Sequence, residues 1–219
     1  MTKGFVIAVD GPAASGKGTI ADGLARLYGY PHLDSGLLYR AVGVAVLASN
    51  GDLDNADAAC AAARSLDAGQ LDDPALRTRE AGEAASRVAV HAEVRAALLD
   101  FQRRFAAQTP GAVIDGRDIG SVIAPWAPAK LFVTATPEVR AERRWRQLEG
   151  QGEHVSYDDI LTDIQKRDER DSARAASPLV MAPDAVLLDT SEMTIDQAAD
   201  AARRIVETAR GRWAQSQAG

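Results

Sequence analysis

The strongest constraint on the fold is a glycine-rich run of nine residues directly after an apolar stretch. Phe5–Val9 has the length and β-branched content of a buried strand. Gly11 and Gly16 let the backbone turn tightly, so that N–H groups and the start of the next helix face a polyphosphate. Lys17 brings a positive charge to the outer phosphates. The run predicts an ATP-binding P-loop made of Gly11, Pro12, Ala13, Ala14, Ser15, Gly16, Lys17, Gly18 and Thr19.

The run departs from the plain P-loop pattern at one position. Gly18 follows the lysine where a hydroxyl residue would normally hold Mg²⁺, and Thr19 comes one residue later. Direct binding of Mg²⁺ by this hydroxyl is therefore left open. The context still favours a P-loop over a solvated glycine turn, because apolar residues follow at helical spacing, at Ile20, Leu24 and Leu27.

Composition limits the class of protein. The 219 residues, 46% hydrophobic and 26% charged, suit one globular domain with insertions. A net charge of -6 argues against a general binder of nucleic acids or anionic membranes. Cys60 is the single cysteine, so an intramolecular disulfide is impossible, and no zinc set is present. The apolar run 41–48 is too short to span a bilayer, and we expect a cytoplasmic protein.

The chain alternates between strand-like and helical patterns. Such alternation predicts a parallel sheet of five strands, covered by helices on both faces, with ligands at the carboxyl ends of the strands. Four strands are expected after the first, over 31–34, 112–115, 130–135 and 185–188. Thr194 and Gln197 predict the cap of a final helix that ends near Gly211, before a frayed tail.

The chain is expected to form a single domain, 1–219. Its core would comprise 1–51, 109–142 and 176–211. The region of about 52–108 is predicted to be a mostly helical insertion, and about 143–175 a lid. Polar residues that follow strands then meet at one edge of the sheet, at 11–19, 34–40, 115–118 and 190–191.

Among P-loop classes, a small kinase fits best. A GTPase needs an Asn-Lys-x-Asp element to read guanine, and neither asparagine, Asn50 or Asn55, lies in one. A motor or large ATPase needs a far longer chain. A kinase needs cationic partners for its acceptor and a closing lid. Seven arginines supply these charges, at Arg140, Arg143, Arg144, Arg146, Arg167, Arg170 and Arg174.

Two interpretations of these arginines remain open. Guanidinium groups match phosphate oxygens bidentately, which favours phosphate binding for the group as a whole. Any single arginine could instead be a surface residue paired with a nearby acid. The available acids are Glu142, Glu149, Asp168 and Glu169.

Four motifs in order give the chain a close resemblance to the bacterial cytidylate kinases. They are the P-loop, Leu33–Gly36 with Tyr39 and Arg40, Asp115–Asp118, and Arg167–Arg174. The resemblance runs from the first strand to the last helix. One departure concerns the insertion, where the family commonly carries a small antiparallel β element. The stretch 66–81 is short and has no strand pattern, which predicts a trimmed, helical insertion with looser nucleotide selectivity.

The resemblance implies a set of site residues. ATP would be the phosphoryl donor, and CMP and dCMP the acceptors. Ser35, Arg95, Asp118 and Arg174 would surround the base, with Ser86 and Asp171 near base or sugar. The acceptor phosphate would meet Arg40, Arg117 and Arg167, and Tyr39 would also belong to the CMP site. The ATP phosphates would meet Arg143, Arg144 and Arg170. From the residues alone, Asp118 could also pair with Arg117, and Ser35 could cap a helix.

The expected chemistry is direct in-line phosphoryl transfer. The acceptor phosphate is already anionic, so no general base is required, and none of His32, His91 and His154 lies in a motif. Mg²⁺ would be held by Thr19 and Asp115 through water, although Asp115 could instead bond the P-loop. A UMP/CMP kinase, another small-acceptor kinase and a non-catalytic nucleotide-binding protein stay open as alternatives. No long apolar stripe is exposed, and a monomer is expected.

Overall fold

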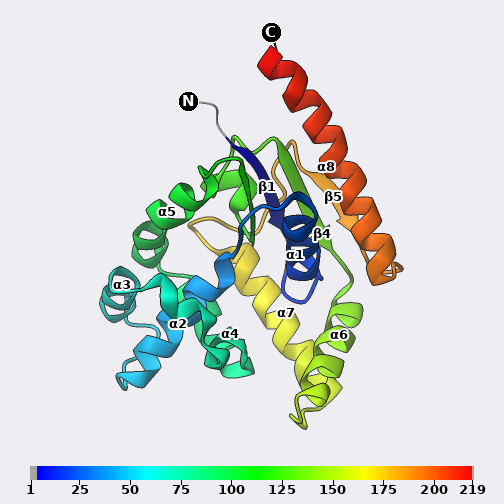
Figure 1. Cartoon of the computed structure of the whole chain (residues 1–219). Coiled ribbons are helices and arrows are strands. Elements are labelled where there is room, and N and C mark those ends of the chain that lie inside the picture. The colour runs from blue at the N-terminus through cyan, green and yellow to red at the C-terminus, as the bar shows by residue number, and fades with distance from the viewer. Residues whose placement is uncertain (1–3, 219) are drawn as a thin grey trace.

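A single parallel sheet carries the fold in the computed structural model of the chain (Figure 1). The structure describes residues 4–218, so residues 1–3 and 219 of the expected domain lie outside the described residues. The strand order is β2-β3-β1-β4-β5, which confirms the predicted five-stranded parallel sheet. The strands are β1 (Phe5–Asp10), β2 (His32–Asp34), β3 (Gly111–Gly116), β4 (Ala129–Thr134) and β5 (Val186–Asp189).

Two helices cover one face of the sheet. Helix α1 (Lys17–Tyr28) and helix α8 (Ile195–Ala218) pack on apolar side chains that alternate along the strands, among them Ile7, Val9 and Leu131. These side chains are fully buried. The P-loop between β1 and α1 therefore starts from the middle strand of the sheet, all of whose residues are buried.

The opposite face is covered by the insertion and its neighbours. Its core joins Val6, Leu33 and Ile114 of the sheet to side chains of helices. The covering elements are α2 (Ser35–Ala48), α3 (Ala56–Arg64), α4 (Arg79–Val88), α5 (Ala92–Ala106) and the π turn η3 (Ile119–Ile123). Two short 3-10 turns, η1 (Ala68–Asp72) and η2 (Pro74–Arg77), complete the insertion. Within the described residues of 52–108 no strand occurs, as the pattern predicts.

The lid region is a helix pair beside the carboxyl ends of the strands. Helix α6 (Pro137–Gly150) and helix α7 (Tyr157–Ala173) share a small core of their own, made by Ala141, Leu148, Ile160 and Ile164. Thr136 and Ser156 cap the two helices through their side-chain oxygens. In Figure 1 this pair and the insertion lie on opposite sides of the sheet edge.

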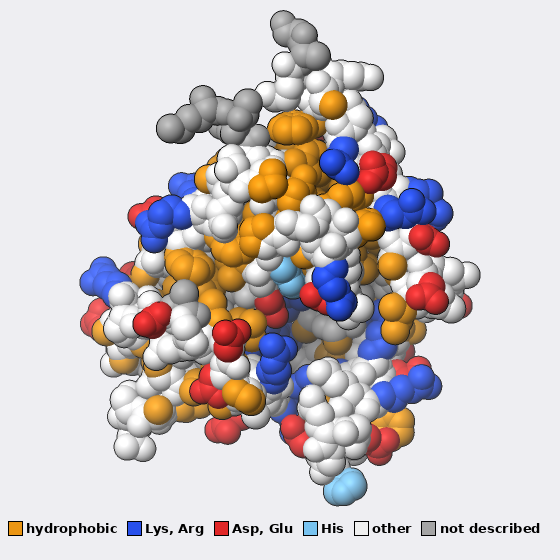
Figure 2. All heavy atoms as spheres, viewed as in Figure 1, with side chains coloured by type: hydrophobic (Ala, Val, Ile, Leu, Met, Phe, Trp, Pro, Cys, Tyr) orange, Lys and Arg blue, Asp and Glu red, His pale blue; other side chains and the backbone are white. Residues whose placement is uncertain are grey.

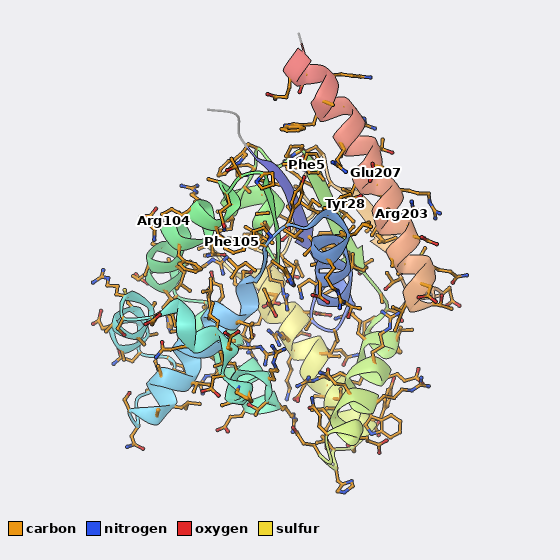
Figure 3. All side chains as sticks on the ribbon, viewed as in Figure 1. Phe5, Tyr28, Arg104, Phe105, Arg203 and Glu207 are labelled. Atoms are coloured by element: carbon orange, nitrogen blue, oxygen red, sulfur yellow. The ribbon has the colours of Figure 1, made fainter. Side chains whose placement is uncertain are left out.

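The final helix differs from the prediction. Thr194 and Gln197 form the expected reciprocal cap, but α8 continues through Gly211 and covers residues expected to be frayed. The ring of Trp213 packs edge-on against Phe5, with centroids 5.4 Å apart, and this contact offsets the cost of a helical glycine. Figure 3 shows Tyr28 beside Glu207, whose carboxylate accepts the phenol hydrogen bond at 2.7 Å. No described helix is long and apolar enough to cross a membrane.

Candidate active site

The P-loop has the tight backbone that its glycines require. A Cβ on Gly11 would lie 2.0 Å from the carbonyl oxygen of Val133, so only glycine fits against the neighbouring strand. Gly16 has φ 88° and precedes the first residue of α1. Lys17 Nζ lies 3.8 Å from Asp115 Oδ2. Burial, together with the nearby charge of Arg117, lowers the pKa of Lys17 to about 8.

A buried carboxylate faces the start of α1. Asp115, the fifth residue of β3, is 1% exposed, and a Cβ on Gly18 would lie 3.9 Å from its Oδ2. Burial and the charge of Asp115 raise the pKa of Asp34, which places two carboxylates near one another. No group of three or more metal-binding side chains forms among the described residues. Oxygen donors of this kind suit Mg²⁺ that also binds phosphate and water, so the site fits this metal.

The three predicted acceptor-phosphate arginines come from different elements. Arg40 of α2 donates to the carbonyl oxygens of Leu76 and Thr78, at 2.7 and 3.1 Å. Arg117 follows β3, and its Nε donates to Asp171 Oδ2 at 2.8 Å. Burial, with the charge of Arg117, lowers the pKa of Arg167 to about 9, and Arg40 contributes to this shift. The fold therefore gathers these cations, as predicted.

The predicted base-binding residues lie next to the same cluster. Arg95 donates to Asp118 Oδ2 at 2.6 Å, and its guanidinium lies 5.4 Å from the centre of the Tyr39 ring. Arg174 pairs with Asp171. The possible ion pair between Asp118 and Arg117 does not form, because each has a different partner.

The capping role considered for Ser35 is also wrong. The N-cap of α2 is Asp34, whose Oδ1 accepts the Gly36 N–H at 2.9 Å. Ser35 is the first helical residue, and its hydroxyl donates to the backbone oxygen of Asp115 at 2.7 Å. The contact holds α2 against the carboxyl end of β3.

The lid arginines divide into two groups. Arg140 is buried and bonds the carbonyl oxygens of Ala135 and Ala13, at 2.9 and 3.2 Å, and also Asp168. Arg146 pairs with Glu142 on the helix surface. Both arginines therefore have an acidic partner of the kind considered, but only Arg146 is a surface residue, since Arg140 is buried.

The other lid arginines lie nearer to the P-loop and the insertion. Arg143 donates to the side chain and backbone of Thr190, at 2.9 and 2.7 Å, and to Ser15 O at 3.4 Å. Arg144 contacts Gln147 at 3.0 Å, and Arg170 lies 2.9 Å from Glu83. Figure 2 shows Lys and Arg side chains inside the hollow between the insertion and the lid.

Buried polar atoms without hydrogen-bond partners mark the site independently. Among the described residues, six such side-chain atoms occur, and all six belong to residues predicted from the sequence to bind nucleotides. An unpaired buried polar atom costs about 1–3 kcal/mol, so a cluster of them indicates a place for a polar ligand. The atoms are Ser15 Oγ, Ser86 Oγ, Arg95 Nε, Arg167 Nε, Arg170 Nη1 and Arg174 Nε.

Two residues near the site were not predicted. Asp10 ends β1 and accepts the backbone N–H groups of Ile119 and Gly120, at 2.8 and 2.7 Å, while burial raises its pKa to about 7. His32 Nε2 lies 2.9 Å from Asp115 Oδ1. The alternation of side chains along 32–34 would have placed His32 on the face of Asp34.

The P-loop and a cluster of arginines lie at the carboxyl edge of a parallel sheet, which is the arrangement of P-loop kinases, and this chain is of that class. Sequence comparison narrows the class. The chain belongs to the cytidylate kinase family, whose model matches residues 7–208.

Named relatives align with nearly the whole chain. The cytidylate kinase of Caulobacter sp. strain K31 is 70% identical, over 95% of this chain and 97% of that protein. The cytidylate kinase of Xanthobacter autotrophicus strain Py2 is 67% identical, over 94% of this chain and 99% of that protein.

Solved structures support the fold at low identity. A gluconokinase from Sinorhizobium meliloti 1021 is 16% identical, with a TM-score of 0.52 and 98% of each chain covered. An uncharacterized protein from Eubacterium ventriosum is 17% identical, with a TM-score of 0.55, over 93% of this chain and 98% of that chain.

Proposed function

We propose that this chain transfers the γ-phosphoryl group of ATP to CMP and dCMP, giving ADP with CDP or dCDP. The observation that carries the proposal is the set of six unpaired buried polar atoms, all on residues assigned to nucleotides. They occur on both sides of the hollow, as two ligands require. The core, the insertion over 52–108 and the lid over 143–175 are then the parts that bring ATP and acceptor together.

The base is selected by the pair of Asp118 and Arg95. Cytosine offers an amino donor at N4 and acceptors at N3 and O2, which a carboxylate and arginines complement. Uracil offers a carbonyl where cytosine has the amino group, so Asp118 would face another acceptor. Both side chains of the pair are less than a tenth exposed, and an unmatched contact there costs about 1–3 kcal/mol.

Catalysis rests on positioning and on neutralising charge. Lys17 and Arg143 lie at the P-loop, where they meet the ATP phosphates. Arg117 and Arg167 meet the acceptor phosphate from the opposite side. Their fixed positions hold the two phosphates in line, and closure of the lid excludes water as a competing acceptor.

Mg²⁺ is assigned to the side of the P-loop that faces Asp115. Asp115 and Thr19 would hold it through water, with the phosphates as the remaining ligands. The metal supplies charge neutralisation at the transferring group when it is bound. We also propose that the enzyme is a cytoplasmic monomer.

The proposal is tested by ADP release from ATP and Mg²⁺ with CMP, dCMP, UMP or AMP as acceptor. We expect strong turnover with CMP and dCMP, weak turnover with UMP and none with AMP. Lys17→Met is expected to lower turnover at least about a hundredfold while CMP still binds. Asp118→Asn is expected to narrow the preference for CMP over UMP.

Other outcomes decide between the alternatives. Equal use of UMP would show that the trimmed insertion has lost discrimination and would indicate a UMP/CMP kinase. No turnover with any of the four acceptors would contradict the proposal and leave another acceptor or a binding protein.

A further inference from the structure

His32 makes a contact inside the site that the expected chemistry does not use. Its Nε2 lies 2.9 Å from Asp115 Oδ1. The side chain of Asp115 is 2% exposed and that of His32 is 22% exposed, so the bond is shielded from most solvent competition. A hydrogen bond to a buried carboxylate is about twice as strong as one between neutral groups.

The sheet fixes this contact. In the register of β2 and β3, His32 lies opposite Val113 and Asp34 lies opposite Asp115. Successive side chains alternate between faces, so His32 reaches Asp115 diagonally on the face that α1 covers. Leu33 points to the other face and is buried there. The position of the imidazole therefore depends on strand geometry and not on a mobile loop.

The two oxygens of Asp115 have different partners. Oδ1 faces His32, and Oδ2 lies 3.8 Å from Lys17 Nζ. The second distance is longer than a hydrogen bond, so Lys17 keeps its donors available for a phosphate. Within the described part of the chain these are the polar partners of the carboxylate. Rotation of the carboxylate is therefore restrained at Oδ1, by His32.

We propose that His32 is a positioning residue that holds the Asp115 carboxylate in the orientation needed for ATP binding. With this bond lost, Asp115 is free to rotate onto Lys17 and to compete with the phosphates, or to turn away from the metal side. The inference rests on the proposed function only in naming ATP as the ligand. It assigns no proton transfer to His32.

The test is calorimetric titration of ATP, with and without Mg²⁺, into the wild type, His32→Leu and His32→Gln. Leucine keeps the bulk but cannot donate, whereas glutamine places an amide donor near the position of Nε2. We expect ATP to bind about 10–100-fold more weakly to His32→Leu and glutamine to restore most of this loss. If ATP affinity falls only in the presence of Mg²⁺, the effect is assigned to the metal side of Asp115. If ATP affinity falls both with and without Mg²⁺, the effect is assigned to competition for Lys17.

Two controls separate positioning from general damage. CMP affinity is measured on each variant, because the side chain of Asp115 lies on the ATP side. His91→Leu removes another half-buried histidine contact, that of Nε2 with Leu53 O at 2.9 Å, and is expected to keep wild-type ATP affinity. The proposal is overturned if His32→Leu binds ATP like the wild type, if glutamine does not restore binding, or if CMP affinity falls equally. Because these are binding measurements, a failed acceptor panel would not mimic any of these results.

Discussion

Asp171 is the point at which the charges of the site meet. It is 1% exposed, bonds Arg117 and Arg174, and also feels the charge of Arg167. One carboxylate therefore faces three guanidinium groups. The excess of positive charge suits an acceptor phosphate, which would complete the neutralisation.

The pKa of Asp171 leads to a pH-dependent prediction. Burial alone would raise this pKa, but Arg117, Arg174 and Arg167 outweigh it and hold the pKa well below its usual value of 3.8. A carboxyl with a lowered folded-state pKa stabilises the fold above its unfolded pKa and loses that effect as pH falls. Asp171→Asn is expected to reduce the free energy of unfolding at pH 7 by about 3 kcal/mol.

This difference is expected to shrink as the pH falls below about 4, because the carboxyl then becomes protonated in the unfolded chain while it is still ionised in the folded protein, and this proton uptake favours unfolding of the wild type. Urea unfolding of both proteins at several values between pH 7 and pH 2.5 measures it. A difference that stays constant over this range would show that Asp171 does not act through its charge.

At the residue scale, the structure brings together residues that the resemblance assigns to one site, but it pairs them differently from the pairing considered for Asp118. Asp171, Arg117, Asp118 and Arg95 were all assigned to the site, but the ion pair considered for Asp118 was the wrong one. The true pairs join residues 54 and 23 positions apart, so they depend on how strands and helices meet. His32 was missed because it follows no motif and acts only through its neighbour on the sheet.

Among the elements, the contact of α2 with α4 depends on one glycine. A Cβ on Gly43 would lie 2.7 Å from Ala84 Cβ and 2.9 Å from the Ala84 carbonyl carbon. The two helices can approach this closely only because position 43 has no side chain. Arg40 lies one turn away on α2, so the spacing of these helices also sets the place of a predicted phosphate contact.

Gly43→Ala is expected to lower the free energy of unfolding by about 1–3 kcal/mol, because the extra methyl group forces the helices apart. Gly23→Ala is the matched control, since it also adds a methyl group to a helical glycine but meets nothing within 4 Å. It is expected to raise the free energy of unfolding by about 0.5–1 kcal/mol through helix propensity. Thermal or urea unfolding measures both, and equal effects would contradict the packing argument.

The bounds of the strands were predicted to within one residue, because short apolar runs end at glycine or polar residues. The length of α8 was not predicted correctly, because Gly211 resembles a glycine that ends a helix. Helix α8 continues on account of the contact between Trp213 and Phe5, which are 208 positions apart in the chain. The residues next to Gly211 in the sequence cannot predict a contact with a residue so far away in the chain.

Across the whole molecule, Arg140 joins three parts. It lies on α6, bonds Ala13 O of the P-loop at 3.2 Å, and bonds Asp168 of α7 at 3.0 Å. It is 3% exposed. The side chain therefore connects the lid to the loop that it would close over.

Arg140→Met is expected to destabilise the protein by about 3 kcal/mol, because it leaves Asp168 and two carbonyl oxygens without a partner. Arg146→Met is the control on the same helix. Its pair with Glu142 is exposed and spans one turn, so we expect a change of at most about 0.5 kcal/mol. Unfolding free energies of the two variants measure the contrast, and similar losses would show that the buried contacts of Arg140 do not stabilise the protein.

Helix α7 makes different contacts on each of its faces. Ile160 and Ile164 pack on α6, Asp163 pairs with Arg79 of the insertion, and Asp171 pairs with Arg117. A helix turns by about 100° per residue, so the loss or gain of one residue in its middle would send every later side chain to the wrong neighbour. A variant with one residue added or removed in the middle of α7 is therefore expected to lose the ion pairs of Asp171, even where the added or removed residue is itself exposed.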